Sequence, residues 1–151
     1  MAAPDEGGRL GPIELLVIEF PLGEVRSEGF ATLTDLVERG VIAVLDLQFV
    51  RSADDGTVER VSAADAVGGD DGELGYLAGA SSGLIGADDI GAAGASIEPG
   101  VLAGVLLLEH TWILPLIDQM ASSGARVVRS ARVDPAQIVA ARDRLRSEDG
   151  R

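Results

Sequence analysis

The chain has 151 residues, no cysteine, a single histidine and a formal net charge of −13 at pH 7. This length suits one domain with its own apolar core. The lack of cysteine excludes disulfides, thiolate nucleophiles and cysteine-ligated zinc. The acidic charge opposes binding to nucleic acids and disfavours a role at anionic membranes. We therefore expect no cofactor and no nucleic-acid partner.

The acidic residues gather in the middle of the chain, where residues 53–98 hold ten acidic residues and one arginine. We expect residues 12–147 to form a single α+β domain that contains residues 53–98 as an acidic insertion. Residues 1–11 and 148–151 are predicted to be flexible tails. No basic signal-peptide start and no run of about 20 apolar residues is present, so we expect a cytoplasmic protein.

The first part of the chain predicts a strand, a helix and a second strand. Ile13–Phe20 is a short, mostly apolar run typical of a buried strand. Glu28–Arg39 has apolar residues at helical spacing, with Ser27 as a candidate N-cap. Val41–Arg51 is strongly strand-like. Its alternation predicts one face with Val41, Ala43, Leu45, Leu47 and Phe49, and another with Ile42, Val44, Asp46, Gln48 and Val50.

The rest of the chain predicts two short elements within the insertion and four elements after it. Val101–Leu108 reads as a second buried strand, and Arg126–Val133 as a strand with one face near water. The remaining elements are a hairpin strand over Thr57–Val61, a short helix over Asp88–Ala95, a helix over Thr111–Ser122 with Pro115 in its first turn, and a terminal helix over Pro135–Arg146 that Asp134 opens.

Without the insertion this order is βαββαβ, the ferredoxin-like arrangement of four antiparallel strands with two helices on one face. The other face would then expose apolar side chains such as Ile42, Val44 and Val50. A contiguous apolar patch of that size is rarely left in water. The terminal helix, the insertion or a second copy of the chain must cover it, and we expect a homo-oligomer.

Two acidic residues, Glu19 and Asp46, lie inside apolar strands and are candidate ligand-binding or interface residues. Burial of an unpaired carboxylate is costly, so each must reach water, an arginine such as Arg129 or Arg132, or another subunit.

Three further candidates, Glu109, His110 and Trp112, cluster at the end of a predicted strand. A carboxylate beside a histidine can tune it as a proton carrier, but neighbours on a strand point to opposite faces. Alternatively, His110 or Thr111 caps the next helix and Trp112 closes the edge of the core. The sequence carries none of the common catalytic motifs, so no catalytic residue is named.

Two further patterns concern the acidic middle. Gly75, Gly79 and Gly83 stand four residues apart, which is compatible with a loop, a closely packed helix or a membrane element. The aspartates of this region lack the spacing of an EF-hand, so we predict no metal site.

Three segments in order, GPIELLVIEFP, LVERGVIAVLDLQFV and EPGVLAGVLLLEHTW, resemble an actinobacterial family, domain of unknown function 6325. The resemblance spans roughly residues 11–142. That family is similar in turn to a broader group of small bacterial proteins with a longer glycine zipper. The resemblance implies a cytoplasmic, stress-associated protein and assigns no activity.

The patterns together favour a non-enzymatic, self-associating protein. One alternative is a small-molecule binding or catalytic domain of the dimeric α/β-barrel type, with a cavity between sheet and helices near His110, Trp112 or Glu19. The sequence specifies no ligand for such a cavity. A second alternative is a peripheral membrane protein that acts through the glycine stripe.

Overall fold

The computed structural model describes residues 10–21, 23, 25, 27–67 and 80–150. Contacts between residues form two units, Met1–Leu116 and Ile117–Arg151. The N-terminal unit holds the sheet and its covering helices, and the C-terminal unit holds most of one helix and all of another. The single domain over residues 12–147 stays a prediction.

The N-terminal unit is built on a four-stranded antiparallel sheet in the order β1-β4-β2-β3. The strands are β1 (Ile13–Phe20), β2 (Ala43–Ser52), β3 (Val58–Val61) and β4 (Leu102–Glu109). β4 pairs along its length with both β1 and β2, so that Leu106 lies between Leu16 and Leu47. The predicted α+β class and the antiparallel sheet are confirmed.

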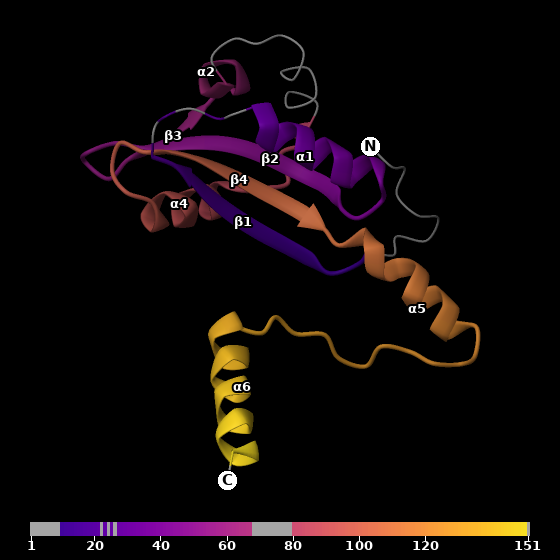
Figure 1. The fold of residues 1–151 in the computed structure, drawn as a ribbon. Helices are drawn as coiled ribbons and strands as arrows, with labels where there is room; N and C mark the ends of the chain where they lie inside the picture. The colour runs from indigo at the N-terminus through magenta and orange to yellow at the C-terminus, as the bar shows by residue number, and fades with distance from the viewer. Residues whose placement is uncertain (1–9, 22, 24, 26, 68–79, 151) are drawn as a thin grey trace. The chain divides into compact units, whose positions relative to one another are not determined.

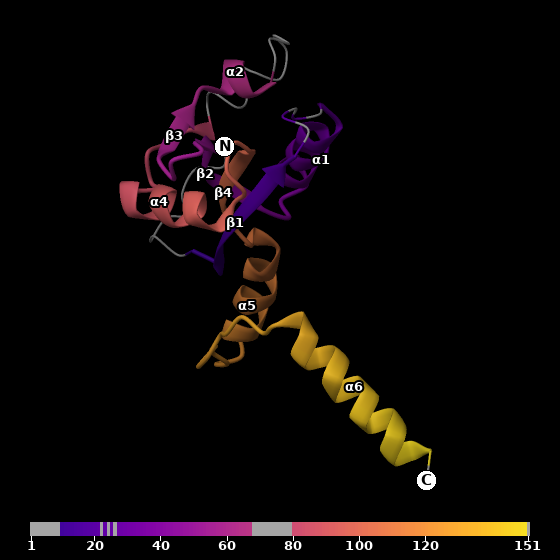
Figure 2. The ribbon, with the colours of Figure 1, turned by 90° about the vertical axis from the view of Figure 1, so that its left-hand side faces the viewer.

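Helices lie on both faces of this sheet, with α1 (Ser27–Glu38) on one face and α4 (Ala87–Ser96) on the other (Figures 1 and 2). On the α1 face, Phe30 packs with apolar side chains of β2 and β4, and the short helix α2 (Ala63–Val67) adds Ala66. On the α4 face, Ile90, Ala93 and Ile97 pack against other side chains of the same strands. The expectation that helices cover a single face is therefore wrong, because the insertion supplies α4.

A β-bulge in β2 changes which side chains share a face. The pairing with β4 passes from Val44 to Asp46, so that Leu45 is an extra residue. An extra residue reverses the alternation of the strand. Val44 before the bulge and Leu47 after it consequently belong to the same core on the α1 face. The predicted faces of this strand, which assumed unbroken alternation, are wrong for this reason.

The ferredoxin-like order is not reproduced in full. Three predicted strands are adjacent in the order β1-β4-β2, but Arg126–Val133 forms no strand, and β3 occupies the far edge instead. An alternating pattern states which side chains could share a face. It does not supply the neighbouring strand whose N–H and C=O groups a strand needs.

The residues after β4 form a short 3₁₀ turn, η1 (Thr111–Ile113), and two helices, α5 (Leu114–Ala121) and α6 (Pro135–Asp149). Pro115 falls in the first turn of α5, and the side chain of Asp134 accepts a hydrogen bond from the backbone N–H of Ala136, as expected of an N-cap. No side chain of α5 or α6 is buried. Of the helices that the structure describes, none is long and apolar enough to cross a membrane.

Gly94 tests the contact that holds α4 against the sheet. A Cβ atom added at Gly94 would collide with the methyl groups of Val58, whereas one added at Gly91 would meet nothing. We predict that Gly94→Ala lowers the free energy of unfolding by about 1–3 kcal/mol. Gly91→Ala, the matched control in the same helix, should raise it by about 0.5–1 kcal/mol. Urea unfolding of both variants measures the difference, and equal effects would contradict the packing.

Candidate functional site

Asp46 is a fully buried carboxylate at the bulge of β2. Its Oδ1 accepts hydrogen bonds from the backbone N–H groups of Leu47 and Ser82, each at 2.9 Å, and from the side-chain amide of Gln48, also at 2.9 Å. Its Oδ2 accepts one from the backbone N–H of Ile85 at 2.7 Å. The carboxylate therefore fastens the loop before α4 to the sheet.

The protonation of Asp46 follows from the same contacts. Burial raises the pKa of its carboxyl group, but the hydrogen bonds from Ile85, Ser82, Gln48 and Leu47 outweigh burial and hold the pKa below its usual value. The sequence led us to expect water, an arginine or another subunit as the partner of this carboxylate. The structure satisfies it with neutral N–H donors of its own unit, which is a structural role.

Glu109 is also buried, at the end of β4, where its Oε2 accepts a hydrogen bond from the backbone N–H of Gly11 at 2.7 Å. A Cβ atom added at Gly11 would lie 2.5 Å from the carbonyl oxygen of His110. Glycine therefore lets the segment before β1 approach the end of β4. Glu109 therefore binds Gly11 and does not pair with His110.

His110 pairs with a residue that the sequence analysis did not single out. Its Nε2 lies 2.9 Å from Oε2 of Glu14, and both side chains are partly exposed. His110 precedes η1 without making a side-chain cap, while the hydroxyl of Thr111 donates to the carbonyl oxygen of Gly40 at 2.9 Å. The side chain of Trp112 is 54% exposed, so it does not close the edge of the core.

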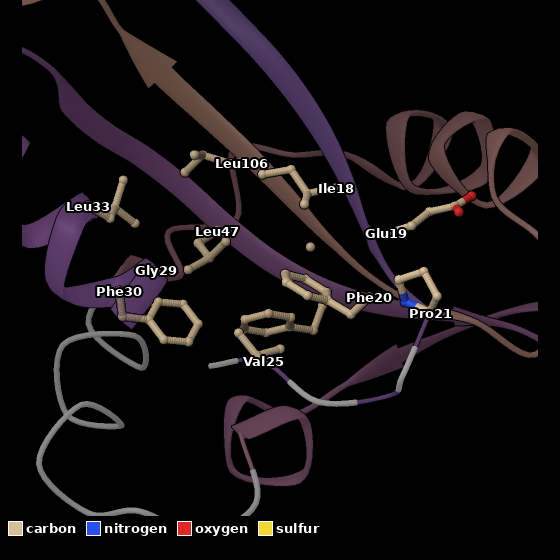
Figure 3. A pocket seen from close by; sticks show the side chains of 12 residues that line it. Ile18, Glu19, Phe20, Pro21, Val25, Gly29, Phe30, Leu33, Leu47 and Leu106 are labelled. Atoms are coloured by element: carbon tan, nitrogen blue, oxygen red, sulfur yellow. The ribbon is translucent and has the colours of Figure 1, made fainter. Parts of the chain in front are cut away.

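An apolar cavity of about 450 Å³ lies between α1 and the sheet (Figure 3). Figure 3 shows Phe20, Leu47 and Leu106 of the three neighbouring strands facing Phe30 and Leu33 of α1. The other residues that line the cavity are Ile18, Glu19, Pro21, Val25, Gly29, Phe49 and Gly104. The volume lies in the range typical of small-ligand pockets, and the lining carries almost no polar surface.

Glu19 borders this cavity without turning its carboxylate into it. In Figure 3 the carboxylate points away from the cavity. Its Oε1 instead accepts a hydrogen bond from the backbone N–H of Glu98 at 3.1 Å, just after α4. Of the three residues that the sequence placed near a cavity, Glu19 lines this one and His110 and Trp112 do not, and Glu19 offers it no charged group.

β1 is the least covered strand of the sheet. Among the described residues no strand pairs with its outer edge. Ile13, Leu15, Val17 and Ile18 remain between 37% and 49% exposed. None of these four side chains belongs to the core under α4. A long, exposed, apolar edge strand is a template for pairing with another chain.

The glycine stripe falls mostly outside the described residues, which include neither Gly75 nor Gly79. Gly83 lies in a bend with a φ of +84°, which is not helical. Asp70 and Asp71 are likewise outside the described residues. Among those that are described, no three potential metal-ligating side chains are grouped.

A comparison with known protein families identifies the family of this chain. The profile of a family of unknown function, DUF6325, matches residues 9–148. The chain belongs to the DUF6325 family. Searches of curated proteins and of solved structures found no match. Membership in DUF6325 confirms the resemblance carried by the three sequence segments, and it assigns no reaction, ligand or partner.

In this DUF6325 chain the five predicted site residues do not converge. Asp46, Glu109 and Glu19 each bind a backbone N–H group, in three different places. The feature that the sequence analysis missed is the pairing of Glu14 with His110, whereas the cavity between sheet and helices was one of its alternatives. The antiparallel pairing of β1 with β4 brings Glu14 and His110 together. The sequence could have indicated this pair only if the register of the two strands had been assumed.

Asp46→Asn tests the buried carboxylate. The side-chain NH₂ group of asparagine is a donor, and it would face a backbone N–H group that is also a donor. We therefore predict a loss of about 2–3 kcal/mol in the free energy of unfolding at pH 7. Because the folded-state pKa of Asp46 is lowered, its stabilisation is present above the unfolded pKa and is lost as the pH falls through the folded value. The gap between wild type and variant should therefore shrink below about pH 4.

The matched control is Asp35→Asn, which removes an exposed carboxylate paired with Arg39 at 3.3 Å. This change should alter stability by less than about 0.5 kcal/mol. Chemical unfolding of both variants is measured between pH 3 and 7, in steps of about one pH unit. A gap for Asp46→Asn that does not depend on pH would contradict the assigned ionisation.

Proposed function

We propose that this protein is a non-enzymatic, self-associating protein that assembles through the outer edge of β1. The observation that carries the proposal is an eight-residue edge strand with exposed apolar side chains. The other edge strand, β3, has four residues, and shortness is one way in which proteins protect an edge. β1 has no such protection among the described residues.

The partner strand in this proposal is Arg126–Val133 of a second copy. This segment has the alternation of a strand, carries Arg126, Arg129 and Arg132, and contains no acidic residue. β1 carries Glu14 and Glu19 and no basic residue. Opposite charges on neighbouring strands stabilise their pairing, and the segment forms no ladder with the sheet within one chain.

The distribution of charge over the two units also supports assembly. The unit Met1–Leu116 contains 20 acidic and five basic residues, a formal net charge of −15. The unit Ile117–Arg151 contains five acidic residues and seven arginines, a net charge of +2. Direct contact between two N-terminal units is electrostatically unfavourable, whereas contact with the C-terminal unit of another copy is favourable.

A structural rather than catalytic use of the buried acids supports the non-enzymatic part of the proposal. Asp46 and Glu109 both bind backbone N–H groups of loops that they hold in place. A general acid or base needs access to a substrate proton, and neither carboxylate lines the cavity. The proposal also includes a cytoplasmic location and an association with stress, both of which the family resemblance implies.

Reversal of the three arginines of the segment tests the proposal. We predict that the wild-type chain is a dimer or larger at micromolar concentration. The triple variant Arg126→Glu, Arg129→Glu, Arg132→Glu should dissociate at least about tenfold more readily, because it places like charges on neighbouring strands. Light scattering after size-exclusion chromatography measures both species.

The control reverses three arginines of α6 instead, as Arg142→Glu, Arg144→Glu and Arg146→Glu. It changes the net charge of the C-terminal unit by the same amount and leaves the proposed strand intact, so it should weaken the assembly less than the variant in the strand does. A wild-type chain that stays monomeric, or equal dissociation of the two triple variants, would contradict the proposed strand.

A further inference from the structure

The cavity beside β1 is large, apolar and partly open to solvent. Its volume of about 450 Å³ is roughly three times that of an apolar cavity of about 150 Å³, which holds one benzene-sized group. Covering its apolar walls with another apolar group removes them from water and is therefore favourable. An occupant with about three apolar side chains or their equivalent would match this volume.

The pairing proposed above determines which face a neighbouring helix covers. A strand laid antiparallel to β1 runs parallel to β4, and in sequence β4 is followed by α5 and then by Arg126–Val133. Segment exchange between copies preserves the contacts that the segment would make in its own chain. The order β4, α5, new strand is then a crossover connection of the same kind as β1, α1, β2.

Crossover connections of this kind share one hand. The second crossover reverses both the direction of its strands and the direction of travel across the sheet. Two reversals amount to a rotation of 180° about the normal to the sheet, which leaves the face unchanged. A crossover of the same hand therefore places α5 on the face that α1 covers, where Ile18 and Phe20 of β1 border the cavity.

The composition of α5 matches this position. Leu116, Ile117 and Met120 of α5, with Ile113 at the end of η1, recur at helical spacing and form one apolar stripe. Leu116 is 51% and Met120 is 53% exposed, and α5 contains a single charged residue, Asp118. Residues 122–125 span at most about 14 Å, so a copy that pairs its strand with β1 must place α5 nearby.

Resting on the proposed function, we infer that α5 of a second copy fills the cavity between α1 and the sheet. The occupant is a helix of this same chain, and its apolar stripe meets Leu33 of α1 and Leu106 of β4. The sheet with α1 and the exchanged helix and strand then complete the βαββαβ arrangement between two chains.

Gly29→Leu tests the inference because it adds a bulky apolar side chain at the wall of the cavity. Gly29 lines the cavity, and a Cβ atom added there meets nothing within 4 Å. Leucine also favours the helix, so the fold should be retained. We predict that the dimer of Gly29→Leu dissociates at least about tenfold more readily than wild type. Gly91→Leu, in α4, makes the same exchange away from the cavity and should leave dissociation unchanged.

A second measurement uses the lack of native cysteine. Leu33→Cys and Met120→Cys chains of different mass are mixed and oxidised, and Val139→Cys in α6 replaces Met120→Cys as the control. We predict a mixed disulfide dimer between Cys variants at 33 and 120 that clearly exceeds the yield of the control pair. An intact dimer without this disulfide overturns the inference and leaves the proposed function standing, whereas a monomeric wild type overturns both.

Other occupants give distinct results in the same experiments. If a small apolar molecule uses the cavity, the intact wild-type dimer takes up the neutral dye Nile red and Gly29→Leu does not, and no mixed disulfide forms. If α5 of the same chain fills it, the double variant Leu33→Cys, Met120→Cys closes its disulfide within one chain at the mass of a monomer. Either result overturns the inference.

Discussion

The two-sided burial of β4 is the constraint on which the rest of the structure depends. β4 pairs with a strand on each side, and seven of its eight residues are buried. Both faces of the sheet must therefore be covered over this strand. The chain uses α1 for one face and, through the acidic insertion, α4 for the other. Neither the core under α1 nor the core under α4 extends far enough to bury the exposed apolar side chains of β1.

The sequence predicted most elements because local pattern decides them. β1, the hairpin of β3, α4 and β4 lie within about two residues of their predicted limits. The faces of β2 could not be predicted, since one extra residue at Leu45 reverses the alternation. Nothing local in that strand signals the bulge. The bulge is stabilised by N–H donors on a loop some 36 residues away, which is a tertiary contact.

The candidate site was harder to predict than the fold. Each acid within an apolar strand suggested a ligand or an ion pair, yet Asp46, Glu109 and Glu19 bind backbone N–H groups supplied by distant segments. The alternation of Arg126–Val133 predicted a strand that the structure does not form, because alternation cannot supply a neighbouring strand. Among the described residues, β1 has no strand at its outer edge, and Arg126–Val133 has the pattern of a strand but no neighbour. Opposite charges on the two segments are the basis of the assembly proposed above.

Amide hydrogen exchange over Arg126–Val133 tests this pairing most directly, because a strand in a ladder protects its N–H groups and a coil does not. The exchange is measured at protein concentrations above and below the dissociation midpoint. Pairing with β1 predicts protection by at least about a hundredfold in the assembled protein, and its loss on dilution. A segment that exchanges at the rate of an unstructured peptide in an intact dimer would contradict strand addition to β1.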